Sequence, residues 1–366
     1  SGPQQEQADE GKEVTYRQTI FGFPMCIYWK KPGESRMKYV SMFDFNNDKG
    51  NLNILGFDRK KYPKAVIREV SDNITFFDHS YRGCWVDDTS KTRNDITAEF
   101  ESRLPGDSEI NEGCIYGEAK TEGQVEQANK ECAALVRFCN WVHSTNQEQA
   151  TGEALPQPFI DKDGKEYTVD NASYRLAKFL TEKDDYLDWE KAVYYYNFTA
   201  RHLMIDSRAK NMHLVTEDGI HFYPIVYDAD TGNGNDNNGK LSYPYYYEDT
   251  DLDAGGNVVF NGQRSALWIN VREGLAEEIA AQDRTLRSSA GYSYEAEKAL
   301  FDSHREQWCE ALFAYAAWAL YKNNPAYIEA ALGDKKHQRN YWMYYSYRYW
   351  DSKFHSGDAP KNNLVL

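Results

Sequence analysis

The stretch DSRAKN at residues 206–211 decides the fold, together with IHFYPIVYDAD at residues 220–230. A helix is predicted before it, over about 186–203, from its apolar spacing. Met212–Thr216 and Ile220–Tyr227 are typical of strands, and EDG at 217–219 between them is typical of a tight turn. The sequence therefore predicts a helix, a polar loop, a β-hairpin and then a carboxylate, Asp228.

This order presents polar side chains as phosphoryl transfer requires them. A carboxylate must orient the attacking hydroxyl, while an amide oxygen and a second carboxylate hold the metal that bridges the phosphates. Protein kinases supply these groups from an Asp-x-x-x-x-Asn loop, a hairpin and a following Asp. Asp206 and Asn211 have that spacing, and Asp228 follows the hairpin. Arg208 is expected to neutralise charge on the transferred phosphoryl group.

The same residues resemble the CotH kinase family, whose members carry such a loop and then a hairpin ending in Pro-x-Trp-Asp-x-Asp. The resemblance implies an atypical protein-kinase fold and, in active members, phosphorylation of protein with ATP and Mg²⁺ or Mn²⁺. It implies that Asp206 is the catalytic carboxylate, that Asn211 and Asp228 bind metal, and that Asp230 is a further ligand. The chain departs from the family at Tyr227, where Trp is usual.

We therefore expect an α+β fold with a kinase-like two-lobe architecture. A β-rich, abbreviated N-lobe would occupy residues 13–105, and a linker 106–120. A helix-rich C-lobe with an embedded β-hairpin would occupy 121–355. Residues 1–12 are expected to be a disordered lead, and residues 356–366 a polar tail.

Further elements are predicted from periodicity and capping signals. Strands are expected within Val14–Trp29, Tyr39–Phe45, Ile74–Phe77 and Ile96–Phe100. Helices are expected over about 122–145, from a cap at Asp170 to about Leu180, over Tyr294–Lys322, and around Arg339–Trp350. Residues 146–169 are expected to be a polar loop.

A kinase-like N-lobe also needs a cation for the α- and β-phosphates of ATP. Lys49 and Arg68 are the candidates, and Lys64 is also available. The first expected strand resembles a middle strand of such a lobe, and the sequence stops at Leu366 in a polar stretch. We therefore expect this chain to be a segment of a larger protein.

Composition limits the partners. A net charge of −15 argues against a nucleic-acid partner and against an anionic membrane surface, since both require a basic face. The 28 tyrosines suit broad, partly wet contact surfaces, although a Tyr-rich core explains them equally well. Six cysteines without a Cys-x-x-Cys pair indicate buried thiols, Cys132 and Cys139 among them, and a reducing compartment.

Three other stretches resemble CotH-related proteins of the tail or muzzle of short-tailed and crAss-like bacteriophages. They are FNNDK at 45–49, SYRLAK at 173–178 and FNGQ at 260–263. This resemblance implies a structural component in a virion, with other copies or other virion proteins as partners in an oligomeric assembly. The alternative is an active ATP-dependent and Mg²⁺- or Mn²⁺-dependent protein kinase, located in a reducing cytoplasm.

Other interpretations stay open. An Asx turn or a helix cap would explain any one of these Asp and Asn residues by itself. An irregular calcium site could use Asp228, Asp230 and Asn235, although the EF-hand spacing fails. A sugar-processing site or a nucleophilic triad is weaker still, because no facing pair of carboxylates and no Ser or Cys elbow is evident. The candidates for the sugar-processing site are Glu248, Asp249, Asp251 and Asp253. The candidates for the triad are His202, His213 and His221.

Overall fold

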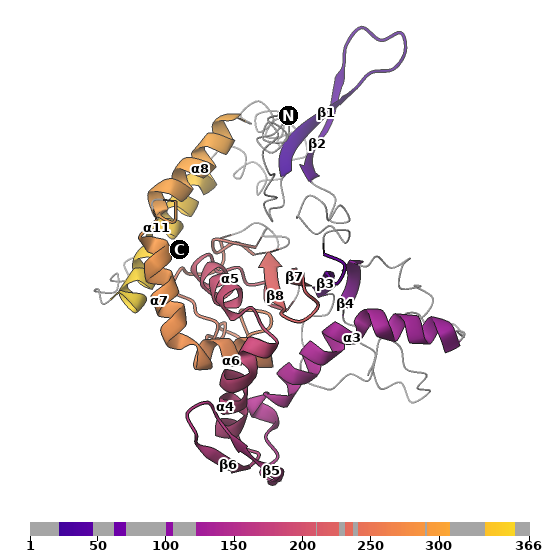
Figure 1. Ribbon diagram of the computed structural model, residues 1–366. Helices are drawn as coiled ribbons and strands as arrows, with labels where there is room; N and C mark the ends of the chain where they lie inside the picture. Colours follow the sequence, from indigo (N-terminus) through magenta and orange to yellow (C-terminus); the bar gives the residue numbers. More distant parts are fainter. Residues whose placement is uncertain are drawn as a thin grey trace, which may run out of the picture. The chain divides into compact units, whose positions relative to one another are not determined.

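The computed structural model describes residues 22–46, 62–70, 100–104, 122–209, 211–226, 231–236, 241–289, 291–307 and 334–355. They contain antiparallel strands and helices that follow one another largely in separate runs, so the expected α+β class is confirmed (Figure 1). The chain divides into two compact units. Unit 1 comprises 1–57, 233–246 and 284–366, and unit 2 comprises 58–232 and 247–283. The units interleave along the chain.

Unit 2 contains a four-stranded antiparallel sheet in the order β4-β3-β7-β8. Its strands are β3 (Val66–Val70), β4 (Phe100–Leu104), β7 (Met212–Thr216) and β8 (Tyr223–Val226). The predicted hairpin is thus confirmed, and it extends a sheet whose strand β3 was not predicted.

Strand β8 begins later than predicted because Asp218 holds the preceding turn. Its Oδ1 accepts hydrogen bonds from the backbone N–H groups of Ile220 and His221, at 2.7 and 2.9 Å. Such an Asx arrangement keeps these two residues out of the strand.

The helices of unit 2 are packed around this sheet. They are α3 (Glu122–Ser144), α4 (Ala172–Glu182), α5 (Trp189–Arg201), α6 (Ala266–Gly274) and α7 (Ala276–Arg287, to Asp283 in this unit), with short 3₁₀ helices at Gln147–Gln149 and Lys183–Asp185. Helix α5 packs on β8 and α6, and α6 also packs on α3 and α4. The predictions for α3 and α5 are confirmed, whereas α6 and α7 were not predicted.

Aromatic side chains fix α3 in the core. Trp141 stacks on Tyr186 with ring centroids 4.8 Å apart, and on Phe179 at 5.5 Å. Phe138 meets Phe222 at 4.9 Å. These contacts join α3 to the chain segments that lead into α5 and β8, and so they help to set where both elements begin.

The N-terminal end of α4 corrects one prediction. Its cap is Asn171, whose Oδ1 accepts from the N–H of Tyr174 at 2.9 Å. Asp170 instead forms an ion pair with Arg175, with an Nε–Oδ1 distance of 2.6 Å. Arg175 also donates to the carbonyl of Asn146 at 3.0 Å. Asp170 therefore ties α4 to the end of α3.

Residues 146–169 are not simply a polar loop, because they include β5 (Ala154–Ile160) and its hairpin partner β6 (Glu166–Val169). Asp161 closes the turn by accepting from the N–H groups of Asp163 and Lys165, at 3.0 and 2.9 Å. Phe159 contacts Tyr174 of α4 at 5.4 Å between ring centroids. The polar composition of the turn concealed these strands.

Unit 1 contains the hairpin of β1 (Gly22–Trp29) and β2 (Lys38–Asn46), and the helices α8 (Tyr294–Gln307) and α11 (Asp334–Phe354). The two helices pack together, with the rings of Tyr294 and Tyr344 5.3 Å apart. The strand predicted at Ile74–Phe77 lies outside the described residues, as does the chain beyond 307 in the predicted helix. Of the strand predicted at Ile96–Phe100, only Phe100 is described, and it begins β4. None of the helices in the described part of the chain is long and apolar enough to cross a lipid bilayer.

The cysteines of α3 differ from each other. Cys139 is a free, buried thiol, as predicted. Cys132 is disulfide-bonded, which contradicts the prediction that it is a free thiol. The disulfide also disagrees with the expected reducing compartment, because such bonds are rare there.

Candidate functional site

The DSRAKN loop follows α5 and is folded into the core of unit 2. Helix α5 is capped by His202, and Leu203 then adopts a φ of 45°, which turns the chain out of the helix. From Arg201 to Thr216, every residue that the structure describes is buried except Asp206 and Asn211. The loop is therefore a buried frame that leaves two polar side chains partly exposed.

These two side chains contact each other. Asn211 Nδ2 donates to Asp206 Oδ2 at 2.9 Å. Asn211 has a φ of 52°, a left-handed conformation that Asn tolerates better than most residues, and it directly precedes β7. Because the side-chain Nδ2 of Asn211 bonds to Asp206, the side-chain Oδ1 points away from this carboxylate, toward another partner. The structure thus brings together two of the residues predicted to form the site.

Asn261 holds the loop from outside it. Its Nδ2 donates to Asp206 Oδ1, while its Oδ1 accepts from the N–H groups of Arg208 and Ala209, at 3.0 and 3.1 Å. Its own N–H donates to the carbonyl of Ile205 at 2.8 Å. One side chain therefore orients the carboxylate and satisfies two buried backbone donors.

Asn261 was missed as a site residue, although it lies in the FNGQ stretch. The signal that could have identified it is the adjacent glycine. Gly262 has a φ of 67°, and an added Cβ would lie 2.8 Å from the carbonyl oxygen of Arg208. The 260–263 segment therefore approaches the loop backbone too closely for a side chain at position 262.

Arg208 does not have the predicted role. Its side chain is fully buried and forms an ion pair with Asp249, with an Nη1–Oδ2 distance of 2.7 Å. Its Nε donates to Thr199 Oγ1 at 3.0 Å, and its guanidinium lies 4.2 Å from the ring centroid of Tyr196. A guanidinium enclosed in this way has no exposed surface for a phosphoryl group, so Arg208 anchors the loop instead.

Asp249 completes this buried cluster. Besides Arg208, it accepts from the hydroxyl of Tyr196 at 3.1 Å and from Arg272 Nη1 at 3.2 Å. Burial, together with the charge of Asp249, raises the pKa of Tyr196. Asp249 was considered for a sugar-processing site, but its 4% exposure and its three partners give it a structural role. The cluster joins α5, the loop and α6.

Of the candidate nucleotide-binding cations, the structure describes Lys64, which is exposed, and Arg68. Arg68 lies on β3, 2% exposed, and its Nη1 donates to the carbonyl of Ile67 at 3.0 Å. Such burial leaves it unsuited to hold the phosphates of a nucleotide. Lys49, Asp228 and Asp230 lie outside the described residues.

The three histidines near the loop have separate partners. His213 is buried on β7, with its Nε2 3.6 Å from Glu69 Oε2 on β3. His221 lies in the hairpin turn, with its Nδ1 2.5 Å from Asp218 Oδ2. The ring of His202 lies 4.6 Å from that of Phe198. These contacts lend no support to a nucleophilic triad.

Asp206 and Asn211 fit a small divalent cation in their chemistry. A carboxylate and an amide carbonyl are hard oxygen donors of the kind that Mg²⁺ and Mn²⁺ prefer. Both residues are partly exposed, and Asn261 and the buried loop restrict their movement. A bound cation would supply charge neutralisation for phosphate groups.

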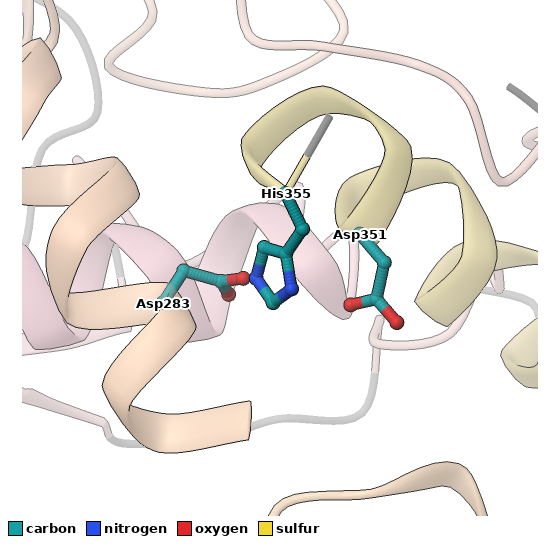
Figure 2. A group of neighbouring side chains, drawn as sticks. All are labelled: Asp283, Asp351 and His355. Atoms are coloured by element: carbon teal, nitrogen blue, oxygen red, sulfur yellow. The ribbon is translucent and has the colours of Figure 1, made fainter. Parts of the chain in front are cut away.

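Figure 2 draws the side chains of Asp283, Asp351 and His355, which are of types that can bind a metal. Asp283 belongs to unit 2, where it pairs with Arg201 at 2.7 Å, both side chains being 1% exposed. Asp351 belongs to unit 1, where it pairs with Arg287 at 2.8 Å. Since each carboxylate already neutralises an arginine of its own unit, we assign no metal to these residues.

The chain matches no known family model and no curated protein sequence. The function must therefore be inferred from the loop itself.

Proposed function

We propose that this chain is a structural component of a bacteriophage virion, of the tail or muzzle type. It would be built on a CotH-like, kinase-like two-lobe fold that retains a divalent-cation site at Asp206 and Asn211. Asp228, which follows β8 by two residues, is the proposed third ligand, and Asp230 a further one.

The observation that carries the cation site is the Asp206–Asn211 pair. The two residues are five apart and hydrogen-bonded, and among the described residues from 201 to 216 they alone are not buried. Strand β8 returns antiparallel to β7, with Val226 paired to Met212, the residue after Asn211. The Asp206–Asn211 pair thus lies where the hairpin begins, and β8 ends beside it. This arrangement supports the loop, hairpin and Asp order of a kinase-like site.

The burial of Arg208 and Arg68 favours a structural role of the chain over catalysis. Phosphoryl transfer depends on cations that meet the phosphates. Both arginines that were candidates for this task are buried, and Arg208 is bonded to Asp249. A cation site without these arginines suits a fold that is kept as a scaffold.

Two of the phage-like stretches support the same assignment, because their residues hold the site or its surroundings. Asn261, in FNGQ, orients Asp206, and Arg175, in SYRLAK, ties α4 to the end of α3. The stretches that resemble tail and muzzle proteins thus include residues that hold the fold together.

The experiment pairs a phosphotransfer assay with a measurement of mass. The purified chain is incubated with labelled ATP and Mn²⁺, and its mass is determined by sedimentation over a range of concentrations. We expect self-association and no transfer of label. A monomer that transfers phosphate, and that loses this activity in Asp206→Ala, would overturn the structural proposal.

That second outcome corresponds to the alternative function, an active protein kinase that uses ATP with Mg²⁺ or Mn²⁺. The orientation of the Asp206 carboxylate by two asparagine side chains is the observation that favours it, because a catalytic carboxylate requires a fixed position. Lys49 and the exposed Lys64 would then be the remaining candidates for the phosphate-binding cation, since Arg68 is buried.

A further inference from the structure

The tip of the β1–β2 hairpin, residues 27–40, exposes large apolar side chains. Their exposed fractions run from 37% to 69%, for Ile27, Tyr28, Trp29, Met37 and Val40. Among the strands that the structure describes, β1 and β2 pair with each other alone, in a two-stranded sheet. A two-stranded hairpin that keeps such side chains in water is typical of a surface that another molecule covers.

The same tip is basic, in a chain whose net charge is −15. It carries Lys30, Lys31, Arg36 and Lys38 against a single acid, Glu34. Glu34 is occupied inside the turn, where it pairs with Lys38 at 3.0 Å and accepts from the N–H of Lys31 at 3.3 Å. Within the described residues, Lys30 and Arg36 form no ion pair, so their charges are available to a partner.

Unit 2 has a hollow of the opposite character, with a volume of about 340 Å³. Five carboxylates line it, together with the aromatic rings of Trp189 and Tyr223. The carboxylates are those of Asp184, Asp188, Glu190, Glu217 and Asp218. Two of these carboxylates pair with lysines of the same chain, Asp184 with Lys183 at 2.8 Å and Asp188 with Lys191 at 3.0 Å, and the excess of carboxylates over lysines keeps the hollow acidic. Lys183 Nζ lies 4.4 Å from the Trp189 centroid, and Lys191 Nζ lies 3.6 Å from that of Tyr223.

We propose that the β1–β2 tip of one copy docks into this acidic hollow of a second copy. The basic side chains of the tip would meet the carboxylates, and Trp29 would cover the apolar part of the rim. Because the two surfaces differ, the contact is heterologous and builds rings or filaments rather than a closed pair. The proposal rests on the structural role proposed above and names its contact surface.

A second copy of the chain fits the tip better than other partners that bind basic surfaces. An anionic membrane or a nucleic acid would attract the tip but repel a chain with this net charge. A second copy offers its own carboxylates and aromatic rings in one hollow. The acidic excess of the chain then contributes to the contact instead of opposing it.

The test is a charge swap followed by sedimentation at low salt. The tip variant is Lys30→Glu with Arg36→Glu, and the hollow variant is Asp184→Lys with Glu190→Lys. All four residues are exposed. Asp184 pairs with the buried Lys183 at 2.8 Å, so the hollow variant must also be shown to be folded. The control is Lys130→Glu with Lys162→Glu, which changes the net charge by the same amount as the tip variant at exposed positions elsewhere.

We expect each swapped variant to self-associate about tenfold more weakly than wild type or worse, and the control to be unchanged. An equal mixture of the tip and hollow variants should restore association, because reversed charges then face each other. An oligomeric wild type that neither swap weakens overturns the docking proposal alone. A loss that mixing does not restore, with the variants folded by circular dichroism, overturns it too. A monomeric wild type overturns the structural function as well, and binding of that monomer to anionic vesicles would identify the tip as a membrane contact.

Discussion

Removing the side chain of Asn261 should loosen the loop that carries Asp206. In Asn261→Ala, the N–H groups of Arg208 and Ala209 lose their acceptor, and both residues are fully buried. A buried donor left without a partner costs about 1–3 kcal/mol. We therefore expect the free energy of unfolding to fall by about 2–4 kcal/mol, a large part of the stability of an ordinary domain.

The assay is urea denaturation, combined with hydrogen exchange at the amides of Arg208 and Ala209. The matched control is Asn257→Ala, because Asn257 bonds only within an exposed turn, to Asp253. The control should change stability by about 0.5 kcal/mol or less. Equal losses in the two variants, or unchanged protection of the two amides in Asn261→Ala, would refute the role given to Asn261.

Three further predictions concern the surroundings of the loop. Asp249→Asn leaves the buried Arg208 unpaired and should lower the free energy of unfolding by about 3–5 kcal/mol in urea, whereas Arg208→Met with Asp249→Leu should cost less than the two single changes together. Hydrogen bonds from Arg175 hold the pKa of Asp170 at about 2. This pair should therefore stabilise the fold above about pH 4 and lose its effect as the pH falls toward 2. In Asp170→Asn, the pH dependence of thermal unfolding should flatten in that range. Gly262→Ala should lower the melting temperature, since its Cβ would clash with the backbone carbonyl of Arg208.

The local features of the site were predictable because they depend on neighbours in sequence. The MHLVT stretch became β7 within its predicted bounds, and the interval of five between Asp206 and Asn211 brought their side chains together across one loop. The hairpin turn was predicted in position, although the capping by Asp218 shortened β8.

The remaining features depend on contacts between distant parts of the chain. An arginine in a polar loop looks exposed in sequence, but Asp249 and the ring of Tyr196 enclose Arg208. Asn261 reaches the loop across 55 residues, and apart from the adjacent Gly262 its local sequence gives no sign of that contact. At α4, the choice of cap between Asp170 and Asn171 was decided by Arg175, which takes the carboxylate for an ion pair.

The proposed cation site is tested most directly by electron paramagnetic resonance, which counts the Mn²⁺ ions bound by the protein during a titration. Asp206→Ala and Asn211→Ala are compared with wild type and with Asn257→Ala, which changes an asparagine outside the site. We predict that wild type and the control bind one Mn²⁺ that both site variants fail to bind. Equal Mn²⁺ binding in all four proteins, or none in wild type, would contradict a cation site at this loop.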